Sequence, residues 1–155
     1  MRIRNRMWED SELSDRAYRE RGRILMTALM VLLGGALGAP ARMMLDRRIT
    51  AALSGKDLAV WIKDFPFGTY FINMSGSFLL GFLTGISVKG HMPALLLAFL
   101  GLGFCGAYTT FSTWSFESVV LFKKRLYKAG FLNIFLSLIL GLILAGVGIA
   151  LGETI

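Results

Sequence analysis

Four long apolar stretches dominate the pattern of hydrophobic and polar positions along the chain. They cover approximately residues 24–41, 67–88, 93–122 and 129–151. A helix needs about 20 mostly apolar residues to cross the hydrocarbon core of a membrane, so each stretch is long enough to span it. The connectors at 89–92 and 123–128 are short, whereas residues 43–66 have room for a short surface helix. We therefore predict an all-α integral membrane protein with four transmembrane helices and its function inside the bilayer.

The overall composition agrees with a membrane protein. Hydrophobic residues make up 55% of the 155 residues and charged residues 17%, against about 25% charged residues in a typical soluble domain. A soluble domain of this size would need a polar shell that this chain cannot supply. Cys105 is the single cysteine, so a disulfide framework is excluded as well. We therefore expect neither a soluble enzyme nor a disordered chain, and no enzymatic activity.

The first 23 residues differ from the rest of the chain. They hold seven arginines and five acidic residues. This interspersed charge predicts a flexible or weakly helical basic tail, residues 1–23, ahead of a transmembrane channel domain, residues 24–155. The tail is either a solvated segment that helps to set topology or a segment that rests on anionic lipid headgroups. Membrane lipid is therefore an expected partner.

The positive charges divide almost evenly between the two sides of the membrane. The tail, the second connector and the C-terminus place eight Lys and Arg on one side, and the first and third connectors place eight on the other. Because Lys and Arg set orientation, this balance favours insertion both ways and an antiparallel dual-topology homodimer. A fixed topology remains open, because the insertion machinery can ignore the distal tail. The even division also argues against a nucleic-acid partner.

Two of the spans contain a regular row of polar and small residues. The rows are Thr69, Asn73, Ser77, Gly81 and Gly85 in the second span, and Asn133, Ser137, Gly141 and Ala145 in the fourth. A spacing of four places each row on one helix face. For the glycines and the alanine we expect close helix–helix contact. The amides and hydroxyls fit either packing or the lining of a polar path.

The third span contains a predicted helix break. Three glycines are followed by four hydroxyl residues, namely Gly101, Gly103, Gly106, Thr109, Thr110, Ser112 and Thr113. Such residues weaken a helix, and backbone groups freed within a membrane must face protein, water or an ion. Freed carbonyls at a symmetry axis would make an all-oxygen site for a hard cation. We therefore expect the third helix to be broken mid-membrane.

Aromatic and charged residues near the break are further candidates. Phe111 and Trp114 lie three residues apart, and the electropositive edges of their rings can contact a small anion. Ordinary core packing is the alternative for both rings. Glu117 is an intramembrane acid, which is a functional candidate by default, and Arg42 ends the first span. The alternative for Glu117 is a structural role, as the partner of an arginine or of polar backbone.

Four segments of the chain resemble the Fluc/CrcB fluoride channels, over approximately residues 30–152. The segments are GGALGAPAR at 34–42, FPFGTYFINMSGSFLLG at 65–81, GFCGAYTTFSTWSFE at 103–117 and NIFLSLILG at 133–141. The TTFST run beside GTxxxNxxGSFxxG is the specific part of the resemblance. It implies an antiparallel dual-topology homodimer with two fluoride pathways, which agrees with the even charge count.

The resemblance also implies roles for individual residues. It implies a fluoride pore lined by Asn73, Thr69, Phe111, Trp114, Ser112, Thr113 and Ser137. It implies vestibule charges at Arg42 and Glu117, and a central structural sodium ion held by the backbone carbonyls of Gly106 and Thr109 from both subunits. Trp114 departs from the family, which usually has phenylalanine at this position.

The function expected from this resemblance is passive, fluoride-selective export of cytoplasmic fluoride across a bacterial inner membrane. Fluoride is small and strongly hydrated, so a pore must replace its water with hydrogen-bond donors. One alternative is a proton-coupled four-span exporter of the small multidrug resistance type, whose working glutamate lies in the first span. The first span has no acid here. A second alternative is a membrane subunit that does not transport.

Overall fold

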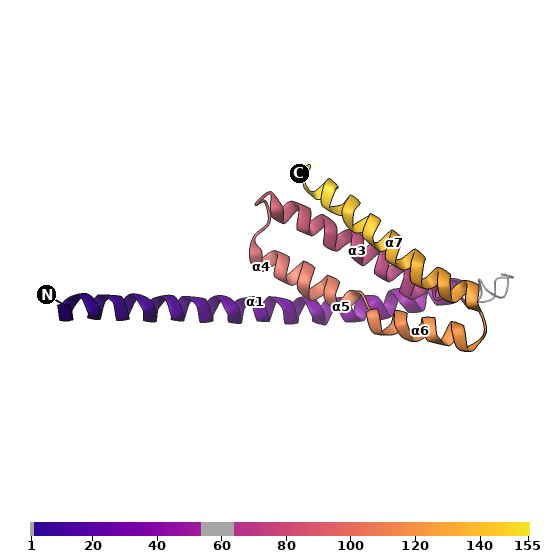
Figure 1. Ribbon diagram of the computed structural model, residues 1–155, viewed down its shortest axis with the longest axis horizontal. Helices are drawn as coiled ribbons and strands as arrows, with labels where there is room; N and C mark the ends of the chain where they lie inside the picture. Colours follow the sequence, from indigo (N-terminus) through magenta and orange to yellow (C-terminus); the bar gives the residue numbers. More distant parts are fainter. Residues whose placement is uncertain (1, 54–63) are drawn as a thin grey trace.

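The computed structural model describes residues 2–53 and 64–155, with side chains described from residue 15 onward. Its elements are α1 Arg2–Leu53, α3 Phe67–Val88, α4 Ala94–Leu97, η1 Ala98–Cys105, α5 Gly106–Tyr108, α6 Phe111–Lys123 and α7 Tyr127–Gly152. All of these described elements are helical (Figure 1). Four segments are long and apolar enough to cross a membrane: Asp15–Leu53, Phe67–Val88, Ala94–Lys123 and Tyr127–Gly152. This confirms the prediction of an all-α protein with four spans.

The first helix is longer than the sequence predicts. Helix α1 has 52 residues and includes Pro40, so it is about 78 Å long at 1.5 Å per residue. The predicted flexible or weakly helical tail is instead the start of α1, whose N-terminal part extends beyond the other helices (Figure 1). Opposite charges one turn apart, such as Asp15 and Arg19, favour a helix in this polar segment.

The first connector is correspondingly shorter than the predicted one. Its first part, up to Leu53, continues α1 instead of forming a separate surface helix. Residues 54–63 of this connector lie outside the described residues. The chain resumes before α3, whose observed bounds, Phe67–Val88, are the predicted ones.

Helices α3 and α7 lie side by side and make the most extensive contact between two helices (Figure 1). Glycines on both helices bring the two backbones together. A Cβ atom on any of them would collide with a backbone oxygen of the other helix: Gly81 with Ala145, Gly85 with Ile149, Gly148 with Phe78, and Gly152 with Phe82. The helix-contact interpretation is therefore confirmed for Gly81 and Gly85, whereas Gly148 and Gly152 were not in the predicted row of the fourth span.

Helix α1 packs across the π-helical segment η1 by the same means. A Cβ atom on Gly103 would lie 2.6 Å from the Val31 carbonyl oxygen. Cβ atoms on Gly34 and Gly38 would collide with the carbonyl oxygens of Phe99 and Phe104. Short segments of π-helix are frequent at functional sites, and only the short helix α5 separates this one from the interruption of the third span.

The third span is interrupted between α5 and α6. Helix α5 ends at Tyr108, and the next two residues are extended, with φ −77° and ψ 160° at Thr109 and φ −148° and ψ 121° at Thr110. Helix α6 then begins at Phe111.

Large apolar side chains on the outer faces, such as Leu142 on α7, are exposed, as expected for helices that face lipid.

Candidate functional site

The interruption is held in place by a side chain from α3. The Thr110 backbone N–H donates to Asn73 Oδ1 at 2.9 Å, and Asn73 Nδ2 donates to the Thr110 carbonyl oxygen at 3.0 Å. One amide therefore pairs with both backbone groups of this extended residue and gives its N–H the acceptor that the interrupted helix does not supply. Asn73 Nδ2 has a second hydrogen that this pairing does not use.

The Gly106 and Thr109 carbonyls are among those that lose their helical donors at the interruption. In a continuous helix, the Gly106 carbonyl would accept from the Thr110 N–H and the Thr109 carbonyl from the Thr113 N–H. Here Thr110 donates to Asn73 Oδ1, and Thr113 donates to Thr110 Oγ1 at 3.2 Å. These are the two carbonyls that the sequence analysis assigned to a sodium ion.

Thr110 organises the start of α6. Its side chain is the N-cap of this helix, because its hydroxyl accepts the Thr113 N–H. The same hydroxyl bonds the Thr113 hydroxyl at 3.1 Å and the Ser112 hydroxyl at 3.3 Å. Thr110 was not among the predicted site residues, although a threonine directly before a helix is a capping signal in the sequence.

A cavity of about 260 Å³ is lined in part by Thr110. Its lining combines polar groups and aromatic rings from three spans. The lining includes Asn73, Ser77, Thr109, Thr110, Phe111, Trp114 and Ser137. The ring centroids of Phe111 and Trp114 are 5.2 Å apart. Phe111 is 76% exposed, so the core-packing alternative does not hold for this ring. We call this space the aromatic cavity.

A second cavity of about 160 Å³ is also lined in part by Thr110. It is lined by Arg42, Met43, Asp46, Thr69, Ile72, Thr110 and Thr113. The Thr69 hydroxyl donates to Glu117 Oε1 at 3.0 Å, so the hydroxyl and the carboxylate form one unit. Asp46 was not a predicted site residue, and it lies one helical turn after Arg42. We call this space the arginine cavity.

The two asparagines of the polar rows have different surroundings. Asn133 is fully buried between α7 and α6, and its Nδ2 donates to the Ser118 hydroxyl at 2.9 Å. The Ser118 hydroxyl donates to the Trp114 carbonyl oxygen, and Trp114 Nε1 donates to the Asn133 carbonyl oxygen at 3.1 Å. These bonds form a closed ring, so Asn133 has a packing role. Ser118 was missed because no spacing rule links it to Asn133.

Three buried polar atoms have no hydrogen-bond partner among the described residues. They are Glu117 Oε2, Asn133 Oδ1 and Ser137 Oγ. A buried hydroxyl normally finds a partner, because leaving it unpaired costs about 1–3 kcal/mol. Ser137 also lines the aromatic cavity. Its O–H is therefore free to donate to a ligand there.

Most of the predicted site residues thus line one of the two cavities or form hydrogen bonds to residues that do. Five of them line the aromatic cavity, namely Asn73, Thr109, Phe111, Trp114 and Ser137. Three line the arginine cavity, namely Arg42, Thr69 and Thr113. Glu117 and Ser112 are linked by hydrogen bonds to residues of the arginine cavity. Gly106 lies outside both cavities, exposed on the surface of the chain with open space beside it.

Comparison with known proteins decides the family. A profile of the CrcB-like protein family, also described as Camphor Resistance (CrcB), matches residues 29–149. The chain belongs to the CrcB-like family. It is 43% identical over 129 residues to a fluoride-specific ion channel of Listeria innocua, covering 83% of this chain and 99% of the relative.

Other members of this family are similar to the same extent. The chain is 38% identical over 128 residues to a fluoride-specific ion channel of Symbiobacterium thermophilum, covering 82% of this chain and 98% of the relative. It is 40% identical over 127 residues to one of Thermococcus onnurineus, covering 81% and 95%. These relatives are named as channels and not as enzymes, in agreement with the expectation from the sequence. The matched family region begins after the first 28 residues.

Proposed function

We propose that this protein is a fluoride-selective passive channel that exports cytoplasmic fluoride. Family membership supports this proposal, because similar members are named fluoride-specific ion channels. The four spans support a multi-pass membrane location, which we propose to be the bacterial inner membrane, with lipid against the exposed apolar faces. The even division of Lys and Arg supports an antiparallel dual-topology homodimer with two pathways.

The aromatic cavity is the observation on which the proposal rests. A passage for fluoride must replace water with donors without holding the anion too tightly. This cavity offers the free O–H of Ser137 and the second Nδ2 hydrogen of Asn73. The rings of Phe111 and Trp114 add electropositive edges without a full positive charge. Because all of these groups are neutral, they can solvate a small anion and release it again.

The arginine cavity is the proposed vestibule. Arg42 would draw the anion from water, and the hydroxyls of Thr69 and Thr113 line the way onward. Thr110 lines both cavities, so the proposed path passes the interruption of the third span. The Glu117 carboxylate is held by Thr69. In this role Glu117 keeps the Thr69 hydroxyl in one orientation beside the path.

The residues at the interruption fit the sodium ion that the family resemblance implies. The Gly106 and Thr109 carbonyls lack their helical donors, and backbone carbonyl oxygens suit a hard cation. Gly106 is exposed, so the same carbonyls of a second copy can approach. Bound sodium would supply a fixed charge that offsets the facing carbonyl dipoles. The interruption lies near the middle of the span Ala94–Lys123, which supports its placement at mid-membrane depth.

Fluoride efflux from liposomes tests the proposal. Purified protein is placed in liposomes with an outward fluoride gradient, and external fluoride is measured with an electrode. We expect release only when a potassium ionophore shunts the charge, because a passive anion channel is electrogenic. The absence of fluoride release under these conditions would overturn the proposal.

A Glu117→Gln variant distinguishes the channel from a proton-coupled exporter. Glutamine keeps an oxygen that can accept from Thr69 but cannot be ionised. We expect this variant to retain shunt-dependent fluoride release. Release that follows a proton gradient, ignores the shunt and is lost in Glu117→Gln would instead support the exporter.

A further inference from the structure

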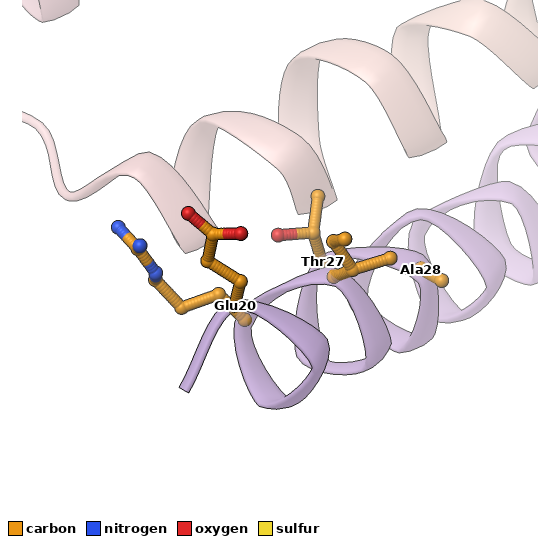
Figure 2. A pocket seen from close by; sticks show the side chains of 5 residues that line it. Glu20, Thr27 and Ala28 are labelled. Carbon is orange, nitrogen blue, oxygen red and sulfur yellow. The ribbon is translucent and has the colours of Figure 1, made fainter. Parts of the chain in front are cut away.

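Two grooves flank α1 at the point where it leaves the helical bundle. The first has a volume of about 580 Å³ and is lined by Glu20, Arg23, Ile24, Thr27 and Ala28. Figure 2 shows Glu20 and Thr27 on the same side of α1, with Ala28 beside Thr27. The second has a volume of about 750 Å³ and is lined by Arg19, Gly22, Arg23, Met26, Thr27, Ala94 and Leu95. It lies between α1 and the start of α4, and we call it the α1–α4 groove.

The lining of the α1–α4 groove changes from charged residues to apolar residues along α1. Arg19 and Arg23 line one end, and Met26 and Leu95 line the other. The apolar stretch of α1 begins directly after Arg23, and the third span begins at Ala94. The arginines therefore lie at the headgroup level of the membrane and the apolar residues at the level of the acyl chains.

The charge in this groove has one sign. Arg19 and Arg23 are exposed and form no ion pair within the part of the chain that the structure describes. Glu20 lines only the first groove, and Asp15 lines neither. The lining of the α1–α4 groove contains no acidic residue. It is therefore complementary to an anion attached to an apolar tail.

Gly22 adds space between the two arginines. A Cβ atom at this position would meet no atom within 4 Å, so packing does not require glycine here. Glycine in a helix interior costs about 1 kcal/mol relative to alanine. Its effect in this helix is to leave the groove open. These α1 residues precede the matched family region, which starts at residue 29, whereas Ala94 and Leu95 lie within it.

We propose that the α1–α4 groove binds an anionic phospholipid. Arg19 and Arg23 hold the headgroup phosphate, and one acyl chain lies along Met26 and Leu95. The bound lipid fixes the depth at which α1 leaves the membrane, because the phosphate and the acyl chain contact the same helix on both sides of the interface. This site does not depend on fluoride conduction.

Lipid titration of the full-length protein tests the proposal. The protein is purified in neutral detergent and titrated with phosphatidylglycerol or phosphatidylcholine, and bound lipids are counted by native mass spectrometry. The test variant is Arg19→Gln/Arg23→Gln. Its matched control is Arg21→Gln, because Arg21 lies on the other side of α1 and lines neither groove. Gly22→Trp fills the groove and keeps both arginines.

The wild-type protein should prefer phosphatidylglycerol to phosphatidylcholine. The double variant should lose affinity for phosphatidylglycerol by on the order of tenfold, Gly22→Trp should also bind less, and Arg21→Gln should bind as the wild type does. Equal loss in Arg21→Gln would overturn the proposal, because the attraction would then be a diffuse property of the charged helix. Equal binding of phosphatidylcholine, or competition by inorganic phosphate at the lipid's own concentration, would overturn it too. If the double variant does not fold, Gly22→Trp decides by the same lipid preference.

Discussion

Asn73 pairs with both backbone groups of Thr110, through hydrogen bonds of 2.9 and 3.0 Å, although the two residues are 37 positions apart in the chain. The pairing gives the Thr110 N–H an acceptor that the interrupted helix does not supply. It also places the asparagine amide in the lining of the aromatic cavity. The same residue therefore stabilises the interruption and belongs to the proposed pathway.

Replacing Asn73 should affect stability and flux together. Asn73→Ala leaves the N–H of Thr110 without its acceptor, which costs about 1–3 kcal/mol for a buried group. We expect a lower melting temperature in detergent and at least a roughly fivefold lower fluoride flux in liposomes, which corresponds to about 1 kcal/mol, the lower end of this range. Thr84→Ala on the same helix is the control, because Thr84 bonds only to Leu80 of its own helix. Wild-type stability and flux in Asn73→Ala would contradict the assignment.

Replacing Ser137, in contrast, should lower fluoride flux without lowering stability. Its hydroxyl has no partner, so Ser137→Ala removes an unsatisfied buried group and should leave the melting temperature unchanged or raise it. Fluoride flux should fall roughly five- to tenfold, the effect of one lost hydrogen bond to the ion. The control is Ser115→Ala, since Ser115 bonds within its own helix. If flux in Ser137→Ala equals that of the wild type, Ser137 is not a pore donor.

Trp114 should contribute to stability through its indole N–H. Trp114→Phe keeps an aromatic ring but loses the bond to the Asn133 carbonyl oxygen, which should destabilise the protein by about 0.6–1 kcal/mol. Ser118→Ala opens the same ring of hydrogen bonds. Denaturation of both single variants and the double variant should therefore give non-additive losses. Strict additivity would mean that the ring does not act as one unit.

Flux through Trp114→Phe should remain close to that of the wild type. A phenyl ring also presents an electropositive edge, and the indole N–H is already used by the backbone of Asn133. The liposome assay measures this directly. Loss of flux without loss of stability would show that the N–H itself contacts the ion.

Two glycines on α7 form a matched pair for testing the α3–α7 contact. A Cβ atom on Gly148 would collide with the Phe78 carbonyl oxygen, whereas one on Gly146 would meet no atom within 4 Å. Gly148→Ala should therefore destabilise the protein by about 1–3 kcal/mol. Gly146→Ala should be neutral or stabilising by up to about 1 kcal/mol, because alanine favours the helix. Similar melting temperatures for the two variants would exclude tight backbone contact at Gly148.

The spans were predictable from the sequence because their signal is local. Hydropathy and length predicted the second span, Phe67–Val88, at its observed bounds. The extent of α1 was not predictable in the same way, because its charged first part and the residues after Pro40 lack the apolar signal. A helix continues through such residues once a neighbouring segment has nucleated it.

The candidate site was only partly predictable. Hydroxyls and glycines marked the interruption to within a few residues, yet the cap at Thr110 and the ring through Ser118 were missed. The two asparagine rows look alike in the sequence, but Asn73 lines a cavity and Asn133 is buried in packing. Their roles depend on the helix that each row faces, which spacing within one helix does not specify.

The sequence by itself determined the class of protein and its four spans, and it predicted a weak point in the third span and a set of candidate site residues. These follow from hydropathy, from helix propensity and from short motifs, which are properties of neighbouring residues. The tertiary structure decided which carbonyls lose their donors, which hydroxyl stays unpaired and which asparagine lines a cavity. Each of these depends on contacts between residues far apart in the chain, such as Asn73 with Thr110, and only the packing of α3, α6 and α7 brings those residues together.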